Sequence, residues 1–434
     1  MNKSWNKKLW LLYQCVLLLI IGVFLARATS GEYVTKVSDG QVIHFSKLYQ
    51  MGRFYDRDEN DITDDEMYEN IIEPEISATK NQKSSVAGVT PWVFGLEDDR
   101  FQLEDLLNPY EERVGGDAKL TYDSNLMKKV KRLVEDRGYE EAYVVVSNWK
   151  TGEILATYGD VYTKQIHPGS TIKPILTAAV LSINPDLKNF IYNCTIENHN
   201  YITKEDVYHI KCAGGASHGT VDMKKAMAKS CNGYFISLIQ QVPKEDLLKV
   251  LEDWGFGSVK SYEQFFYWDQ SFLGDSSKEL DYLLAAIGQA NVQITPFAMN
   301  LCTNALISGT GMIREPQRVA AKRVTSEDEW SEISFEETHV FCEESVAQEV
   351  QNYLLEVPKT GTLSKYALKE FAAKTGTAQY EKYNAIWTTG GLISEDTPYS
   401  VTVCINQVKK NASSSEAGSM VKDILTYMIG GSEE

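Results

Sequence analysis

Ser170 and Lys173 stand three residues apart in the stretch HPGSTIKPIL, residues 167–176. A serine hydroxyl is a weak nucleophile, and a neutral amine beside it can act as its general base. Backbone amides at a helix start can stabilise the oxyanion that forms when the hydroxyl attacks a carbonyl. The pair therefore predicts acyl transfer through a covalent intermediate on Ser170.

The residues after Ser170 predict a buried helix, because apolar side chains recur at helical spacing over residues 172–183. Pro174 lacks an amide hydrogen and is tolerated only in the first turn, so the helix must begin close to the serine. Residues three apart lie about 60° from each other around a helix. Lys173 can therefore reach the face that carries the hydroxyl.

Lys173 must be neutral to accept a proton. Lowering the pKa of a lysine from ~10.4 to ~7 costs about 4.6 kcal/mol. Burial and a second nearby cation can supply such a shift. The sequence therefore predicts a second lysine at the site.

Ser-x-x-Lys is a short pattern, and context has to select among its copies. It also occurs at Ser4, Ser77, Ser147 and Ser419. Ser170 opens a buried helix immediately after a Pro-Gly break, which the other copies do not. We therefore take Ser170 as the nucleophile.

Ser230 and Asn232 lie downstream in KSCNGYF, after a helix-like stretch over residues 221–229. A serine and an amide on a short turn can relay a proton and bind a substrate amide. An ordinary turn between helices explains the same residues when they are taken singly. The pair gains weight only from the other motifs.

Lys-Thr-Gly occurs at Lys150, Lys359 and Lys374. Lys374 lies on an apolar strand-like run, FAAKTGTAQY, with further strands after it. On an edge strand, Gly376 would let a substrate backbone approach closely, and Thr377 could donate its amide to an oxyanion. We therefore select Lys374 as the second lysine.

The three motifs, in the order Ser-x-x-Lys, Ser-x-Asn and Lys-Thr-Gly, resemble those of the penicillin-binding protein and serine β-lactamase superfamily. The resemblance runs from about residue 115 to the C-terminus. MGRFYDRDEN (51–60) looks like the segment just outside the membrane in class B penicillin-binding proteins. No room remains for the glycosyltransferase domain of class A members. The resemblance implies a D,D-transpeptidase.

The resemblance also implies a role for each residue of the first two motifs. Ser170 would be acylated by the terminal D-Ala-D-Ala of a peptidoglycan stem peptide, or by a β-lactam that mimics it. Lys173 would be the base. Ser230 would pass the proton toward the leaving group, and Asn232 would hold the acyl side chain.

In the third motif, Lys374 would lend positive charge, and Thr375 and Thr377 would lie near the substrate carboxylate. The backbone amides of Ser170 and Thr377 would form the oxyanion hole. The implied partners are the stem peptide, β-lactams and other membrane proteins of wall synthesis. No cofactor is implied.

Lysines at positions 3, 7 and 8 precede an uncharged apolar run, residues 9–26, which is about long enough to span a bilayer. Such flanking lysines favour a cytoplasmic N-terminus. We expect a cytoplasmic tail (1–8), a transmembrane anchor (9–26), a membrane-proximal region or reduced pedestal (27–114) and a transpeptidase domain (115–434) outside the cytoplasm. A cleaved signal peptide is the alternative, since Ala26-Arg27-Ala28 offers a cleavage site.

The expected fold is α+β. Residues 142–159 read as two strands joined by a turn, residues 385–393 and 399–405 alternate like half-buried strands, and a helix closes the chain over residues 416–429. The long middle, residues 171–310, is mostly helical in pattern. We expect a β-lactamase/transpeptidase-like sheet flanked by helices, its edges drawn from distant sequence, with an all-helical subdomain and one preceding transmembrane helix.

Composition excludes one class of partner. The net charge of −17 argues against nucleic-acid binding, because phosphate neutralisation needs basic patches that the sequence lacks. An acidic run over residues 56–75 holds ten carboxylates against Arg57 and predicts a solvated face.

The seven cysteines show no C-x-x-C pair and no His/Cys spacing suited to zinc, so no metal site is expected. Cys194 and Cys212 could form a disulfide outside the cell, or remain buried thiols.

Three rival functions stay open at this point. A D,D-carboxypeptidase differs in using water as the acceptor, and a serine β-lactamase shares the nucleophile and both lysines. From another class, a β-lactam sensor or a scaffold of a wall-synthesis complex could carry the same motifs. The intact motifs count against a vestigial site, and the apolar run with a membrane-proximal region favours a cell-wall enzyme.

Overall fold

The computed structural model describes residues 49, 50, 52–63, 113, 114, 116–202, 207–256, 279–290, 292–324, 326–333 and 338–430. The predicted tail (1–8) and anchor (9–26) lie outside these residues, as does most of the predicted membrane-proximal region. Within the described residues, none of the helices combines the length and the apolar character needed to cross a bilayer.

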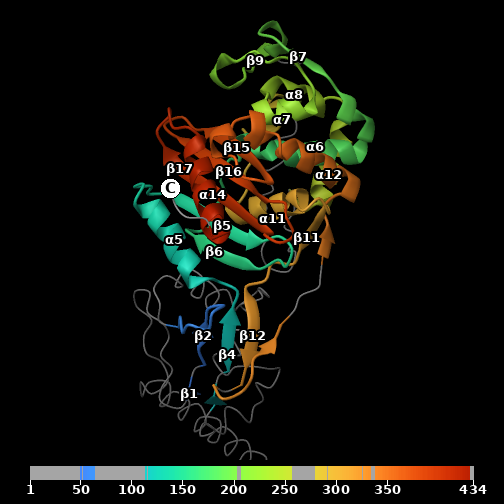
Figure 1. Ribbon diagram of the computed structural model, residues 1–434. Coiled ribbons are helices and arrows are strands. Elements are labelled where there is room, and N and C mark those ends of the chain that lie inside the picture. Colours follow the sequence, from blue (N-terminus) through green and yellow to red (C-terminus); the bar gives the residue numbers. More distant parts are fainter. Residues whose placement is uncertain are drawn as a thin grey trace, which may run out of the picture.

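A five-stranded antiparallel sheet forms the centre of the region over residues 142–408 (Figure 1). Its order is β15-β16-β17-β5-β6, so strands from the two ends of the region meet in one sheet, as predicted. The strands are β15 (Phe371–Gln379), β16 (Asn384–Leu392), β17 (Tyr399–Val408), β5 (Ala142–Asn148) and β6 (Ile154–Tyr158). Strand β15 is one edge of this sheet.

Helices cover both faces of the sheet. Neighbouring residues of a strand point to opposite faces, and on β16 Thr388 hydrogen-bonds to the Ser414 carbonyl beside α14 while Thr389 bonds to Thr303 of α11. One face carries α14 (Ser415–Met428) and α5 (Ser124–Glu135), and the other carries α11 (Pro296–Ile307). The α+β layers match the predicted architecture.

The helical region beside the sheet begins with α6. It packs near the edge strand β15 (Figure 1). Its helices are α6 (Lys173–Ile183), α7 (Met223–Lys229), α8 (Asn232–Ile239), α9 (Lys244–Asp253) and α10 (Glu279–Ala285). Helices α12 (Glu344–Leu354) and α13 (Val357–Thr360) bridge from α11 back to β15.

The prediction that this subdomain is all-helical was wrong. Two small antiparallel sheets interrupt it, one of β7 (Tyr192–Cys194) with β10 (Gly219–Val221), the other of β8 (Asn200–Ile202) with β9 (Val207–His209). Strands of three residues are too short to show an alternating pattern, so no periodicity could be detected in them.

A second sheet of four strands lies below the five-stranded sheet (Figure 1). Its order is β13-β12-β4-β2, from β13 (Ser331–Glu332), β12 (Val319–Arg323), β4 (Asp117–Leu120) and β2 (Phe54–Tyr55). Strand β2 pairs with β4 in parallel, whereas β12 pairs with β4 antiparallel. The two-residue strands β1 (Tyr49–Gln50) and β3 (Arg113–Val114) pair nearby, and β11 (Met312–Arg314) pairs with β14 (Thr338–Val340).

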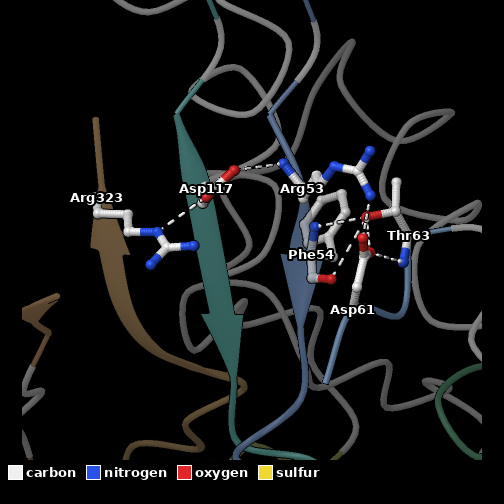
Figure 2. Close-up of polar contacts among 6 residues, drawn as sticks. All are labelled: Arg53, Phe54, Asp61, Thr63, Asp117 and Arg323. Carbon is white, nitrogen blue, oxygen red and sulfur yellow. Dashed lines mark hydrogen bonds and ion pairs between the residues drawn. The ribbon is translucent and has the colours of Figure 1, made fainter. Parts of the chain in front are cut away.

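Charged side chains connect the strands of this lower sheet, and Figure 2 shows the arrangement. The Asp117 carboxylate accepts a hydrogen bond from the Arg53 backbone amide at 2.8 Å and one from Arg323 Nε at 2.9 Å. The Arg53 side chain pairs with Asp61, whose carboxylate also accepts from Thr63 Oγ1 at 2.7 Å. The segment that precedes β4 by some sixty residues is thus fixed to it by the bond from the Arg53 amide to the Asp117 carboxylate and by the pairing of β2 with β4.

The prediction of a solvated acidic run was wrong for Asp56, which is fully buried. Its carboxylate accepts hydrogen bonds from the amides of Asp58 and Asn60 and from the Asn60 side chain, at 2.8–2.9 Å. Burial raises the pKa of Asp56, but hydrogen bonds from Ser124 and Asn60 outweigh it and lower that pKa below its usual range. A carboxylate with several donors can be buried where a charge run otherwise predicts exposure.

Candidate active site

The predicted nucleophile lies on a 3₁₀ turn, Gly169–Ile172, that leads directly into α6. Pro174 occupies the first turn of α6, as its missing amide hydrogen requires. Gly169 has a φ of +54°, a conformation that side-chain-bearing residues rarely adopt. The turn therefore places Ser170 at the N-terminal end of a buried helix, in agreement with the sequence.

Gly376 of β15 packs against this turn. A Cβ at Gly376 would lie 2.5 Å from the Pro168 carbonyl oxygen and 3.0 Å from the Thr171 amide nitrogen. A Cβ at Gly169 would in turn lie 2.6 Å from the Thr377 backbone. The close approach that Gly376 permits is therefore that of the protein's own nucleophile turn, rather than the substrate approach that we had expected.

Lys173 is fully buried and has a filled hydrogen-bonding shell. Its Nζ donates to the Ser230 carbonyl oxygen at 2.8 Å, to Asn232 Oδ1 at 2.8 Å and to Ser230 Oγ at 3.3 Å. The ammonium also lies 5.1 Å from the centre of the Phe235 ring. The first two predicted motifs are thus in direct contact.

Lys374 is also fully buried, on the edge strand β15. Its Nζ donates to Ser230 Oγ at 2.9 Å and to the Thr375 carbonyl oxygen at 2.9 Å. Ser230 therefore receives hydrogen bonds from both lysines. The structure brings the second lysine to the site, where the need for a second cation had predicted one.

Ser230 owes its position to a left-handed backbone conformation, with φ +53° and ψ +42°, at the C-terminal end of α7. The chain turns there and enters α8 at Asn232. The side chains on both sides of Cys231 consequently point to Lys173. The predicted turn between helices is observed, and it is part of the site.

Both lysines have lowered pKa values. Burial lowers the pKa of Lys173 to about 8, against a smaller opposite effect of the nearby Cys231 and Cys212. Burial and the charge of Lys173 lower the pKa of Lys374 well below its usual value. Since the repulsion between the two is mutual, we regard them as one coupled pair that does not hold both protons readily. One neutral amine next to Ser230 follows from this arrangement.

A cleft of about 900 Å³ opens over these residues. Its lining includes Ser170, Ser230 and Asn232, and from β15 Thr375, Gly376 and Thr377. The buried amines of Lys173 and Lys374 lie beneath them. All eight predicted site residues therefore meet at one cleft or directly under it.

The edge of β15 is oriented toward this cleft. The Thr377 carbonyl oxygen accepts from Gln289 Nε2 at 3.4 Å, so it faces the side of β15 away from β16. In an antiparallel strand the N–H and C=O of one residue point to the same side. The Thr377 amide therefore points away from β16 as well, beside the turn that carries Ser170.

Competing motif copies lie elsewhere. Lys359 belongs to α13, and Lys150 lies in the exposed turn after β5, where it pairs with Glu395. Ser147 is buried in β5 and donates to Asn300, and Ser419 lies inside α14. Ser4 and Ser77 fall outside the described residues.

His167 is held by packing and hydrogen bonds beside the turn that carries Ser170. Its Nδ1 is 2.6 Å from the Val292 carbonyl oxygen, and its own carbonyl accepts from Trp387 Nε1 at 2.9 Å. These contacts hold the segment that precedes the nucleophile turn.

The sequence reasoning missed one cluster, formed by Cys194, Cys212, His218 and Cys231. Its ligand atoms lie within 4.8 Å of one another, although no pair of these residues has a spacing typical of zinc sites. Cys194 and Cys212 are free thiols, with sulfurs 3.8 Å apart, so the disulfide alternative is not what the structure shows. The available clue was three cysteines and a histidine between residues 194 and 231.

The family model described as "Penicillin binding protein transpeptidase domain" matches residues 142–426, which include every predicted site residue. The chain belongs to the penicillin-binding protein transpeptidase family. Among curated relatives, stage V sporulation protein D of Bacillus subtilis (strain 168) is 29% identical over 170 residues. That match covers 33% of this chain and 25% of the relative's length.

Solved structures share the transpeptidase fold. Penicillin-binding protein A of Mycobacterium tuberculosis, in its ceftriaxone acyl-enzyme complex, superposes with a TM-score of 0.71 at 16% identity, over 88% of this chain and 98% of that one. Penicillin-binding protein 3 of the same organism, with aztreonam, gives 0.65 at 15% identity, over 89% and 98%. The D,D-transpeptidase domain of a peptidoglycan glycosyltransferase from Eggerthella lenta gives 0.64 at 18% identity, over 88% and 99%.

Proposed function

We propose that this penicillin-binding protein transpeptidase is a membrane-anchored D,D-transpeptidase that cross-links peptidoglycan stem peptides through an acyl-enzyme on Ser170. One observation carries the proposal: the amines of Lys173 and Lys374 converge on Ser230 Oγ, at 3.3 and 2.9 Å, beneath a cleft that Ser170 lines. Such an arrangement can move a proton from a hydroxyl and deliver it to a leaving group.

The first half of the reaction makes the ester. Ser170 Oγ attacks the carbonyl of the penultimate D-Ala as its proton passes to Lys173, the lysine whose pKa burial lowers to about 8. The amides of Ser170 and Thr377 would stabilise the oxyanion. The amide bond then breaks, the terminal D-Ala leaves as an amine, and Ser230 passes it the proton.

The second half of the reaction uses a different nucleophile. An amine of a neighbouring stem peptide attacks the Ser170 ester, gives up a proton through the same relay, and regenerates the serine. The edge of β15 provides a place for the extended donor peptide, because main-chain groups on an exposed edge can pair with an added strand. Lys374, Thr375 and Thr377 would bind the terminal carboxylate, and Asn232 the acyl side chain.

A β-lactam would follow the first half only, because its leaving amine stays tethered to the acyl group. We therefore propose covalent inhibition by β-lactams. The anchor at residues 9–26 would hold the catalytic domain outside the cytoplasm, next to other membrane proteins of wall synthesis.

Mass spectrometry of the full chain after penicillin treatment tests the proposal. We expect one adduct on the peptide that contains Ser170, lost in Ser170→Ala and kept in Ser419→Ala, which removes another Ser-x-x-Lys serine. An adduct on a different serine, or none, would contradict it.

The persistence of the adduct separates the rival functions. A transpeptidase hydrolyses the penicilloyl ester slowly and stays acylated, whereas fast hydrolysis would identify a β-lactamase. Release of D-Ala from a stem pentapeptide, with and without an added amine acceptor, separates transpeptidase from carboxypeptidase. An acylated protein that releases no D-Ala would instead be a sensor or scaffold.

A further inference from the structure

Four potential metal ligands from four separate segments meet behind the Ser-x-Asn turn. Cys194 ends β7, His218 precedes the paired strand β10, Cys212 precedes a 3₁₀ turn at Ala213–Gly215, and Cys231 is the N-cap residue of α8. Register places Gly219 opposite Cys194 in the small sheet, which brings His218 beside that cysteine. The three cysteines are buried and His218 is half-buried.

Three of the six distances between their ligand atoms match a tetrahedral site, and all six are within 4.8 Å. The sulfurs of Cys194 and Cys212 are 3.8 Å apart, those of Cys212 and Cys231 are 3.8 Å apart, and His218 Nδ1 is 3.5 Å from the Cys194 sulfur. With Zn–S bonds of about 2.3 Å and Zn–N bonds of about 2.0 Å, a tetrahedral site has S–S edges of about 3.8 Å and S–N edges of about 3.5 Å.

We propose that Cys194, Cys212, His218 and Cys231 bind one structural zinc ion. Three thiolates and one imidazole in a closed tetrahedral arrangement select zinc over the oxygen-preferring Mg²⁺ and Ca²⁺. On binding, each thiol gives up its proton to solvent as its sulfur bonds to the metal. A disulfide would instead require two sulfurs about 2.05 Å apart.

The surroundings of the cluster suit metal-bound sulfur. The backbone amides of Asn232 and Gly233, at the start of α8, hydrogen-bond to the Cys212 sulfur, and the His218 amide does so to the Cys194 sulfur. Amide donors around metal-bound thiolates orient the ligands and tune the metal. His199, which is buried, places its Nε2 3.3 Å from the Cys194 sulfur and 3.7 Å from the Cys212 sulfur. We assign His199 as a donor to the ligands and His218 as the ligand.

The proposed metal site is continuous with the catalytic site. Cys231 stands between Ser230 and Asn232, and Asn232 Nδ2 donates to the carbonyl of Lys211, the neighbour of Cys212, at 2.8 Å. Zinc bonds to Cys212 and Cys231 would therefore fix the turn that carries Ser230 and Asn232 to the neighbouring segment at Cys212. Both side chains would then be held against Lys173. The four ligands are therefore positioning residues. This positioning role, unlike the metal site itself, rests on the proposed function.

Metal analysis of the full chain, purified in detergent with a thiol reductant, tests the site without reference to activity. We expect about one zinc per chain, retained after dialysis. Cys212→Ser and His218→Ala should lose most of it, whereas Cys302→Ala, which removes a buried thiol of α11, and His199→Ala should retain it. Zinc that is retained in His218→Ala and lost in His199→Ala would overturn the assignment of His218 as the ligand.

Wild-type protein supplies a test that does not depend on whether the variants fold. A strong chelator should remove the zinc and lower the melting temperature, and added Zn²⁺ should restore both. Co²⁺ added to the stripped protein should give the visible absorption of a tetrahedral thiolate site. A wild-type chain that holds no zinc after loading, or a Cys194–Cys212 disulfide found by non-reducing peptide mapping, would overturn the proposal.

The rate of penicillin acylation tests the coupling separately. Stripped protein should acylate at least about tenfold more slowly, the usual scale for losing support around a site, and Zn²⁺ should restore the rate. If the protein binds zinc but its acylation rate does not change when the zinc is removed, the positioning role alone is overturned. A chain that binds zinc but is never acylated would contradict the proposed function and leave the metal site standing.

Discussion

The cleft and the lower sheet both bury positive charge, but they compensate it differently. In the cleft, Lys173 and Lys374 are fully buried, and the hydrogen-bond acceptors that the structure describes around them are carbonyl, hydroxyl and amide oxygens. In the lower sheet, Arg323 bonds to the carboxylate of Asp117 and lies 4.2 Å from the centre of the Trp330 ring.

The difference has a chemical consequence. An opposite charge nearby favours the charged form, whereas burial among neutral groups disfavours it. Arg323 consequently stays charged and structural, with its pKa raised by the Asp117 carboxylate against the effect of burial. The lysines lose affinity for their protons, and that loss makes an amine available as a base. The same kind of charge holds strands together in one region and, in the proposed mechanism, takes part in proton transfer in the other.

Replacing Lys173 by methionine should give the largest effect. We expect the rate of penicillin acylation to fall about 10³-fold, the scale of a lost general base. The melting temperature should change little, because the relief of a buried charge offsets the loss of the hydrogen bonds that Lys173 donates. Stopped-flow or gel-based labelling together with thermal denaturation measures both. An acylation rate within tenfold of wild type would contradict the assignment of Lys173 as base.

Asp117→Asn should produce the opposite pattern. Removing one partner of a largely buried ion pair costs about 3 kcal/mol, because Arg323 is left without its counter-charge. We expect the free energy of unfolding in urea to fall by that amount, with the acylation rate of the folded protein within twofold of wild type. A large loss of acylation at full stability would show that the lower sheet controls the cleft.

The pH dependence of acylation should report the lysine with a pKa of about 8. The neutral amine is the active form, so the rate constant should rise about tenfold per pH unit below pH 8 and level off above it. Asp117→Asn should keep this profile, since it lies outside the cleft. A flat profile between pH 6 and pH 8 would contradict the role of the coupled lysines.

Lys150→Ala should have the smallest effect and serves as the matched control for the lysine variants. Lys150 begins a second Lys-Thr-Gly copy, and its ion pair with Glu395 joins side chains that are 47% and 77% exposed. Such surface pairs contribute about 0.5 kcal/mol or less. Both the acylation rate and the stability should therefore match wild type, and a loss of labelling would reopen the choice of Lys374.

The sequence predicted the parts of the fold that have a long, regular pattern. Residues 142–159 became β5 and β6, and the alternation after residue 384 became β16 and β17. Strands of two or three residues, such as β2 and β7, were not predicted, because no period can be read from so few positions.

For the site, the sequence by itself determined the start of α6, through the backbone chemistry of Pro174, and the need for a second lysine, through the pKa that a base requires. It also supplied the motif order on which the resemblance to the family rests, and the family match confirms that the chain belongs to this family. These are properties of single residues and short stretches.

The tertiary structure decided which distant groups meet. It placed Lys374 against Ser230 across 144 positions of sequence, packed Gly376 on the nucleophile turn, buried Asp56 under its donors and assembled the Cys/His cluster. Spacing along the chain does not encode such contacts, because they depend on how sheets and helices pack after each has formed. A local pattern specifies an element, whereas a site needs elements brought together.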